Sequence, residues 1–202
     1  MANILIYGVD EFFRQGLMHL ISTIFNREYN EKVTFFSDLS AETVWNADVI
    51  LISLRQGELH TCKEELDMRR KGVIIGLVDF QHFDRSEIPS CISDISFVNK
   101  KSSVDNFYAR IVSAWNYGSQ LIHYPRTYKC ACCIKKQLTP REFSVAKGLL
   151  IGKTAKVIAS ELNVSRKTVF SNKYSIMKKY KIDSNKNLLL FLTSLIENDP
   201  LS

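Results

Sequence analysis

The 202-residue chain lacks any apolar run approaching the roughly 20 residues that a membrane-spanning helix needs. Its start, MANILIYGVD, has neither the basic beginning nor the long apolar stretch of a secretory signal peptide. The five cysteines are an odd number and cannot all pair within one chain, which fits a reducing compartment. These absences predict a cytoplasmic protein.

Sequence motifs of common enzymes are also missing. There is no P-loop, no dinucleotide-binding fingerprint and no Ser, His and Asp set of the catalytic-triad kind. The adjacent carboxylates Asp10 and Glu11 would diverge on a helix, and Glu64 and Glu65 are typical of a solvated face. The chain has no internal repeat and no low-complexity tract. We therefore expect no enzymatic activity, no catalytic residues and no cofactor.

The basic residues are concentrated at one end of the chain. The whole sequence has 27 Lys and Arg against 21 Asp and Glu. Residues 138–202 hold 11 of the basic and 5 of the acidic residues, which leaves 16 of each sign in residues 1–137. The entire net charge of +6 thus lies in the last third. A neutral front module joined to a basic one favours a sensor or partner domain followed by a nucleic-acid binder.

Short apolar runs alternate with amphipathic segments over residues 1–117. DVILIS, at residues 48–53, is a continuous apolar run, typical of a strand buried on both faces of a parallel sheet. The pattern predicts strands at 3–7, 32–36, 48–53, 73–78 and 95–98, with helices at 10–25, 40–45, 61–70 and 104–117. This alternation predicts a doubly wound, flavodoxin-like α/β domain with a parallel five-stranded sheet.

Residues 118–137 form a predicted linker, because glycine, serine and proline interrupt its pattern. The linker holds three cysteines near His123, namely Cys130, Cys132 and Cys133. Their spacing is C-x-C-C rather than the C-x₂-C of a zinc ribbon, and no second ligand pair is visible. We expect ordinary linker thiols and no bound metal, with structural roles for Cys62 and Cys91.

The first helix of the basic module is predicted from its ends. LTPRE, at residues 138–142, places Thr139 as N-cap, Pro140 at the first helical position and Glu142 at the third, which makes a capping box. Gly152 is a typical C-terminal residue for that helix. Ser184 can begin a further helix at residues 185–197, so residues 138–202 predict an all-α, four-helix domain.

Between these helices lies a predicted helix-turn-helix. Thr154 caps a helix at 155–162, Asn163 suits a left-handed turn, and Ser165 caps a helix at 166–180. Val169, Ile176 and Tyr180 of the second helix can face inward. Five cations remain for its outer face, as phosphate binding requires: Arg166, Lys167, Lys173, Lys178 and Lys179.

Several short motifs occur here in a characteristic order: LTPRE, Gly152, K-x-I-A at 156–159, L-x-V-S at 162–165, KTV at 167–169 and IMKKY at 176–180. Together they resemble the LuxR/FixJ-type DNA-binding domain. The resemblance implies that the second helix enters the major groove, where Phe170, Ser171 and Tyr174 face bases. The DNA-binding residues that we expect are Lys156, Ser165, Arg166, Lys167, Thr168, Phe170, Ser171, Asn172, Lys173, Tyr174, Lys178 and Lys179.

The front module resembles a response-regulator receiver domain, and RQGL at residues 14–17 is similar to the first-helix signature of that family. The phosphorylation chemistry is missing, however. The family's acidic metal-binding pair falls on Gly8 and Val9, and its phospho-acceptor Asp falls on Ser53, a degenerate acceptor position. Its hydroxyl residue falls on Val78, and only Lys100 matches. We expect that phosphorylation is lost and that Lys100 is an ordinary surface lysine.

The whole pattern is most similar to atypical, RcsA/BglJ-like regulators. The resemblance implies a phosphorylation-independent transcription regulator, an activator in the family pattern, located at the nucleoid when it binds double-stranded DNA. It would act as a homodimer or as a heterodimer with another LuxR-type regulator such as RcsB. The apolar residues of the last helix would form a dimer contact or complete the core: Leu188, Leu189, Leu192 and Ile196.

Two alternatives of other classes remain open at this point. One is a ligand-, redox- or metal-responsive switch that uses the linker cysteines. The other is an adaptor that binds proteins and never DNA. The operator sequence, the sign of regulation (activation or repression), the inducing signal and the choice between homodimer and heterodimer do not follow from the sequence.

Overall fold

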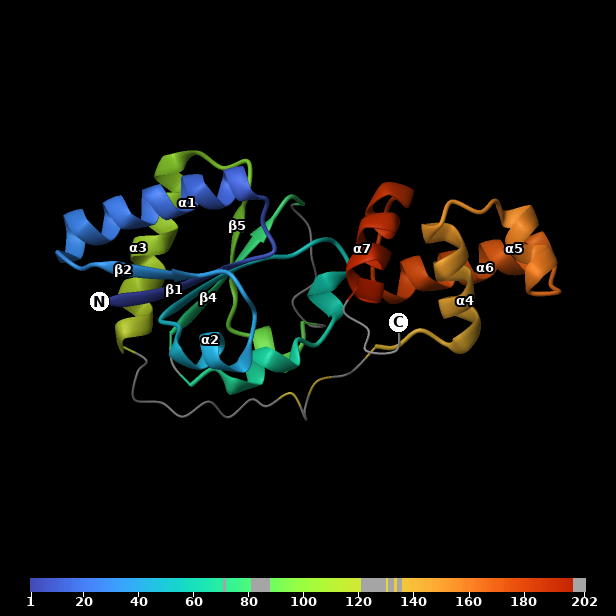
Figure 1. The fold of residues 1–202 in the computed structure, drawn as a ribbon, viewed down its shortest axis with the longest axis horizontal. Coiled ribbons are helices and arrows are strands. Elements are labelled where there is room, and N and C mark those ends of the chain that lie inside the picture. The colour runs from blue at the N-terminus through green and yellow to red at the C-terminus, as the bar shows by residue number, and fades with distance from the viewer. Residues whose placement is uncertain (71, 81–87, 121–129, 131–132, 134–135, 198–202) are drawn as a thin grey trace. The chain divides into compact units, whose positions relative to one another are not determined.

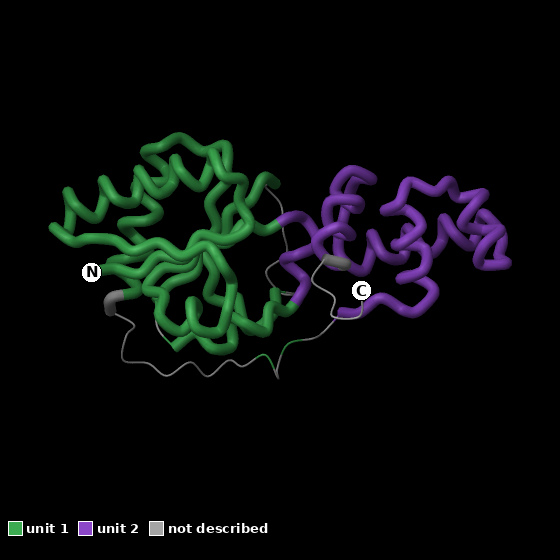
Figure 2. The backbone as a smooth tube through the Cα atoms, in the orientation of Figure 1, with its two compact units in different colours: residues 1–54, 62–134 green, residues 55–61, 135–202 purple. Residues whose placement is uncertain are grey.

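The computed structural model describes residues 1–70, 72–80, 88–120, 130, 133 and 136–197 (Figure 1). The chain divides into two compact units, shown in different colours in Figure 2. Unit 1 comprises Met1–Leu54 and Cys62–Ile134, and unit 2 comprises Arg55–Thr61 and Lys135–Ser202. Among the described residues, no helix combines the length and the apolar character that crossing a membrane requires.

Unit 1 is built on five parallel strands in the order β2-β1-β3-β4-β5. This order is the flavodoxin-like one, so the predicted doubly wound fold is confirmed. β3 and β4 are buried at every position, as their unbroken apolar sequences predict. The strands are β1 Ala2–Tyr7, β2 Val33–Phe36, β3 Val49–Ser53, β4 Val73–Val78 and β5 Ser96–Asn99.

Three α-helices cover the sheet: α1 Glu11–Ile24, α2 Ala41–Asn46 and α3 Val104–Gln120. α1 and α3 lie on one face and α2 on the other (Figure 1). Asp10 caps α1 by accepting a hydrogen bond from Phe13 N–H, and Ser40 caps α2 through a capping box with Thr43. The buried side chains of α1 and α3 pack on the sheet in one apolar core.

The connections that follow β3 and β4 differ from the expected α-helices. The helix predicted at 61–70 is replaced by short 3₁₀ turns, η2 Glu58–His60 and η3 Glu64–Met68, and η5 Ser90–Ile92 precedes β5. Leu66 is the only buried residue of η3. Because one apolar residue does not make the stripe that holds an amphipathic helix on a sheet, the segment forms a 3₁₀ turn instead.

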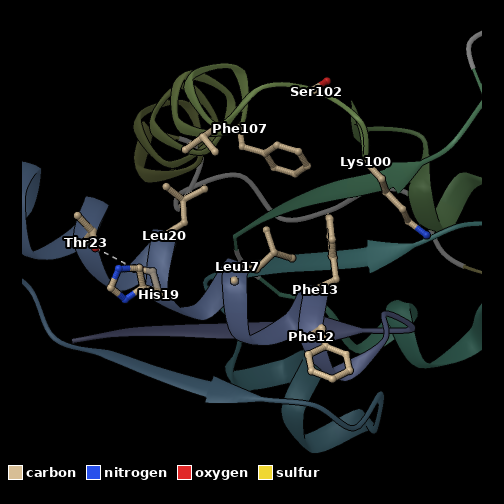
Figure 3. Close-up of a pocket in the computed structure, with 11 residues that line it drawn as sticks. Phe12, Phe13, Leu17, His19, Leu20, Thr23, Lys100, Ser102 and Phe107 are labelled. Atoms are coloured by element: carbon tan, nitrogen blue, oxygen red, sulfur yellow. Dashed lines mark hydrogen bonds between the residues drawn. The ribbon is translucent and has the colours of Figure 1, made fainter.

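An apolar groove with a volume of about 550 Å³ opens between α1 and α3 (Figure 3). Phe13, Leu17 and Leu20 of α1 line it together with Phe107 of α3. Phe12, at the edge of the groove, is 91% exposed. A large aromatic side chain left in solvent beside an apolar groove is typical of an association surface.

Unit 2 consists of four α-helices among its described residues, and the predicted all-α domain is confirmed. They are α4 Pro140–Leu150, α5 Ala155–Glu161, α6 Arg166–Lys179 and α7 Asn185–Glu197. Asn163 has a φ of 51° between α5 and α6, the left-handed turn that the sequence predicts. Gly152 has a φ of 75° after α4, as expected of a residue that ends a helix.

The apolar residues of α7 divide between the core and the surface. Leu188 and Leu192 are buried with Phe191 and Tyr180 in the core of unit 2, so these two follow the alternative in which the residues complete the core. Leu189 is 43% exposed and stays available for contact. The side chain of Ile196 lies outside the described part of the chain. A small domain needs most of its large apolar side chains for its own core.

Candidate nucleic-acid interface

α5 and α6 form a helix-turn-helix on the scaffold of α4. Val145 of α4, Ile158 of α5 and Val169 of α6 are buried in one apolar cluster, and Val164 from the turn packs against it. Gly148 makes close packing possible, because a Cβ there would lie 2.8 Å from Ile158 Cγ1. This core fixes how α6 is rotated about its own axis, and therefore which of its side chains face the solvent.

The caps predicted for these two helices are present. Thr154 accepts a hydrogen bond from Val157 N–H at the start of α5, and Ser165 accepts one from Thr168 N–H at the start of α6. The hydroxyl groups of Ser165 and Thr168 are also 2.9 Å apart and share a hydrogen bond. The N-terminus of α6 is therefore ordered.

The outer face of α6 is basic and aromatic. Arg166 and Lys167 are exposed in its first turn, and Lys178 is exposed near its end. The ammonium group of Lys173 lies 5.7 Å from the centroid of the Tyr174 ring, which draws the two side chains together. Lys156, in the first turn of α5, is exposed as well. This face can attract and hold an anionic backbone.

Three residues expected to face bases also lie on the surface of α6. Tyr174 is 61% exposed, Phe170 is 45% exposed, and Ser171 is exposed. Asn172 is half-buried, and its side-chain amide donates to the Thr168 carbonyl over 2.8 Å, which engages one of its groups within the helix. Exposed aromatic rings among cations offer apolar contacts to a partner as well as charge.

Lys179 was predicted to be one of the outer cations of α6, but its side chain binds to other residues of unit 2. Its ammonium group donates to the Gln137 carbonyl over 2.9 Å and forms an ion pair with Glu142. Ser175, also on α6, donates its hydroxyl to Glu142 Oε1 over 2.7 Å. Glu142 is 4% exposed and completes the capping box with Thr139. One carboxylate thus joins the start of α4 to the second half of α6.

The charge of Glu142 is strongly stabilised in this setting. Burial alone would raise its pKa, but hydrogen bonds from Lys179, from Thr139 N–H and from Ser175 lower the pKa to about 2. Burial, together with the negative charge of Glu142, raises the pKa of Tyr180 to about 12. The Tyr180 hydroxyl donates to the Lys136 carbonyl over 2.9 Å, so it too is satisfied without ionising.

Ser53 and Lys100 lie together at the strand ends of unit 1. Ser53 ends β3 and is buried, and its Oγ accepts a hydrogen bond from Lys100 Nζ over 2.7 Å. The expectation that Lys100 is an ordinary surface lysine is therefore wrong. Gly8 packs so closely that a Cβ there would lie 3.3 Å from the Ser53 carbonyl oxygen.

The two acidic residues that follow β1 have other tasks. Asp10 caps α1 through its side chain, and Glu11 accepts hydrogen bonds from Gln15 over 2.7 Å and from Arg14. Val78, at the end of β4, is buried and apolar. In the described part of the chain, no group of three or more acidic side chains that could hold a Mg²⁺ ion lies beside Ser53 and Lys100.

Unit 2 is similar to a known family of proteins. Residues 136–192 match the family described as bacterial regulatory proteins, luxR family. No curated protein matches the chain by sequence.

Among solved structures, RcsB from Salmonella enterica serovar Typhimurium bound to promoter P1flhDC shares 19% identity, with 96% of this chain and 98% of that chain covered, at a TM-score of 0.52. RcsB of the same organism bound to promoter rprA shares 20% sequence identity. The match covers 96% of this chain and 100% of that chain, with a TM-score of 0.47. Full-length FixJ from B. japonicum shares 17%, covering 98% of both chains, at 0.38. The first of these supports the two-domain fold.

Glu142→Gln should destabilise unit 2 in a way that depends on pH. The folded pKa of about 2 lies below the ordinary value of 4.5, so the carboxylate stabilises the fold above pH 4.5 and loses this effect as the pH falls towards 2. At pH 7 the loss should be on the order of 3 kcal/mol, shrinking below pH 4.5. Urea titrations of the full chain, followed through NMR signals of α4 and α6, measure it.

Glu161→Gln is the matched control. Glu161 is exposed and pairs with Lys153 over 2.6 Å, so its loss should have little effect on stability. Equal destabilisation by both substitutions, or a Glu142→Gln effect that persists unchanged at pH 3, would contradict the role given to the buried carboxylate.

Proposed function

We propose that this chain, whose residues 136–192 form a domain of the LuxR family of bacterial regulatory proteins, is a sequence-specific DNA-binding transcription regulator. The observation that carries the proposal is the outer face of α6, where cations and exposed aromatic rings lie together on a helix held by a buried scaffold. Such a face suits the major groove, where phosphates position the helix and base edges are read.

The residues divide by role under this proposal. Arg166, Lys167, Lys173 and Lys178 on α6, with Lys156 on α5, contact phosphates. Phe170, Ser171 and Tyr174 meet base edges, and Phe170 can pack against a thymine methyl group. Lys179 is assigned mainly to the ion pair with Glu142, since two of its donors already have partners within unit 2.

Lys173→Ala should weaken binding to all DNA sequences and flatten the dependence of log K on log salt by roughly one unit. The reason is that each cation that neutralises a phosphate releases a counterion. Fluorescence anisotropy with a short duplex, repeated from low to physiological salt, measures both quantities. The matched control is Lys186→Ala, which removes the same charge from an exposed position on α7.

Tyr174→Ala provides the contrast within α6. This change should alter the preference among duplex sequences more than the salt slope, because the ring carries no charge. An unchanged affinity and slope for Lys173→Ala, or equal effects from Lys186→Ala, would contradict the placement of α6 on DNA. Absence of salt-dependent DNA binding by the intact chain would favour the adaptor alternative.

We further propose that the regulator acts as a dimer, with itself or with another LuxR-type regulator. The groove between α1 and α3, with exposed Phe12 at its edge, supports association through unit 1. Leu189 on α7 supports a smaller contact through unit 2. LuxR-type regulators of this fold include RcsB, which has been captured on promoter DNA.

Phe12→Asp should shift the chain towards the monomer, because an exposed carboxylate cannot enter an apolar contact without losing its hydration. Sedimentation velocity over a range of concentrations measures the shift, and the same experiment on Leu189→Asp tests α7. Trp45→Asp is the control, since Trp45 is an exposed aromatic residue on the opposite face of the sheet, on α2. If the Phe12→Asp protein associates like the parent, the groove is not the association surface. Association with partner regulators is then tested by co-purification.

We also propose that unit 1 works without phosphorylation. A serine hydroxyl cannot form an acyl phosphate, and the pocket around Ser53 offers Lys100 but none of the carboxylates that would hold Mg²⁺. Control then passes to protein abundance, to partner supply or to a ligand.

Acetyl phosphate and beryllofluoride should therefore change neither the sedimentation nor the DNA affinity of the protein. Ser53→Ala should bind DNA like the parent. Ser53→Asp should not gain phosphorylation, because the metal carboxylates are still missing. Phosphate transfer is followed with radiolabelled donor. Incorporation of label into the parent, with a matching rise in DNA affinity, would make unit 1 a working receiver.

A further inference from the structure

Four cysteines from distant parts of the sequence meet in unit 1. Their sulfur atoms all lie within 4.8 Å of one another. Cys62 lies between η2 and η3, Cys91 lies in η5, and Cys130 and Cys133 follow α3. Cys91 and Cys130 are buried, and Cys62 and Cys133 are half-buried. The cluster is therefore largely shielded from solvent. Three separate segments of the chain contribute to it.

The expectation that the linker cysteines have no second pair of possible ligands is wrong. Cys130 and Cys133 have the C-x₂-C spacing of zinc sites once Cys132 is set aside. Cys133 N–H donates to the Cys130 carbonyl over 3.0 Å. The second pair is Cys62 and Cys91, which the chain brings in from the connections after β3 and β4.

The sulfur separations fit one metal ion. Zinc bonds to thiolate sulfur at about 2.3 Å, so the edge of a tetrahedron of four sulfurs around it is about 3.8 Å. The Cys62 and Cys91 sulfurs are 4.0 Å apart, close to that edge and far beyond the bond length of a disulfide, about 2.0 Å. The larger separations within the cluster need a shift of only about 1 Å to reach tetrahedral geometry.

Polar main-chain groups lie beside the four cysteines. Main-chain N–H groups approach the sulfurs: that of Lys63 approaches Cys91, and those of Ser90 and Cys91 approach Cys133. Such N–H groups are the outer-shell partners that orient metal ligands. A zinc ion with four thiolates keeps two net negative charges, which these dipoles help to stabilise.

Arg69 supplies a buried positive charge next to the cluster. Its side chain is fully buried and forms an ion pair with Asp94 through Nη2. In the described part of the chain, its Nε and Nη1 have no hydrogen-bond partner. Arg69 is close enough to Cys91 for their charges to interact. A buried guanidinium with two unused nitrogens is costly, unless a nearby anionic centre offsets its charge.

We propose that Cys62, Cys91, Cys130 and Cys133 bind one Zn²⁺ ion in a closed, tetrahedral, structural site. All four coordination positions are filled by protein thiolates, which leaves none for substrate or water. The thiol protons leave to solvent when the metal binds, so no oxidant or reductant is needed.

The place of the site in the fold explains what the metal does. The connections after β3 and β4 consist of short 3₁₀ turns among the described residues, and these bury few apolar side chains. Zinc ties both connections to the segment that follows α3, at the point where helix packing is missing. The energy of metal binding then becomes folding energy for this edge of unit 1.

The test begins with the intact chain, purified without chelators and with thiols kept reduced. Mass spectrometry of the metal content should find one zinc ion per chain. Thiol titration of the native protein should find four of the five cysteines protected, and an organomercurial should release zinc as they react. Replacement by Co²⁺ should give the absorption bands of tetrahedral cobalt thiolate.

Two neighbouring substitutions make a matched pair. Cys133→Ser should reduce the zinc content from one ion per chain to almost none, while Cys132→Ser should leave it unchanged, because Cys132 is not one of the four proposed ligands. Cys62→Ser should behave like Cys133→Ser and should also increase hydrogen exchange in η3 and η5. The metal content of the parent decides the matter even if a variant fails to fold.

Several results would overturn the proposal. One is a reduced parent protein that holds no zinc and binds none when titrated. Another is a disulfide between any two of the four cysteines in protein from reducing cells. The third is a Cys132→Ser protein that loses its zinc while the Cys133→Ser protein keeps it. Lys173→Ala protein should retain its zinc whatever its DNA affinity, so the outcomes for metal and for DNA binding are independent.

Discussion

The buried carboxylate of Glu142 is the interaction on which the arrangement of unit 2 depends. It accepts from Thr139 N–H at the start of α4 and from Ser175 and Lys179 in the second half of α6. A carboxylate that is 4% exposed is tolerable only when its oxygens are satisfied, so α4 and α6 have to stay in register. The same register keeps Val169 and Ile176 inside and turns the cations of α6 outward.

The apolar core of unit 1 and the pocket at its strand ends are built from different residues. The core formed by the sheet, α1 and α3 contains residues such as Ile4, Leu51 and Ile111. These residues are not part of the pocket at the strand ends. In that pocket Lys100 donates a hydrogen bond to Ser53, and Gly8 packs closely against the same serine. Packing and catalysis are separate demands on such a domain.

The edge of unit 1 formed by η3 and η5 is stabilised by different means. Amphipathic helices would normally cover this part of a parallel sheet. Here short turns bring polar and sulfur-containing side chains inward, including Arg69 and Cys91. A metal tetrathiolate would compensate for the missing apolar contacts, as metals do in domains too small to build a sufficient core.

The sequence by itself determined the order of elements, the sheet class and the helix-turn-helix, because these follow from local signals: the apolar run of β3, the capping box at Thr139 and the left-handed Asn163. Tertiary structure alone decided three other matters. It placed Leu188 and Leu192 in the core, drew Lys179 to Glu142, and gathered Cys62 and Cys91 beside Cys130 and Cys133. Each depends on contacts between residues far apart in the chain, and periodicity and spacing describe only near neighbours.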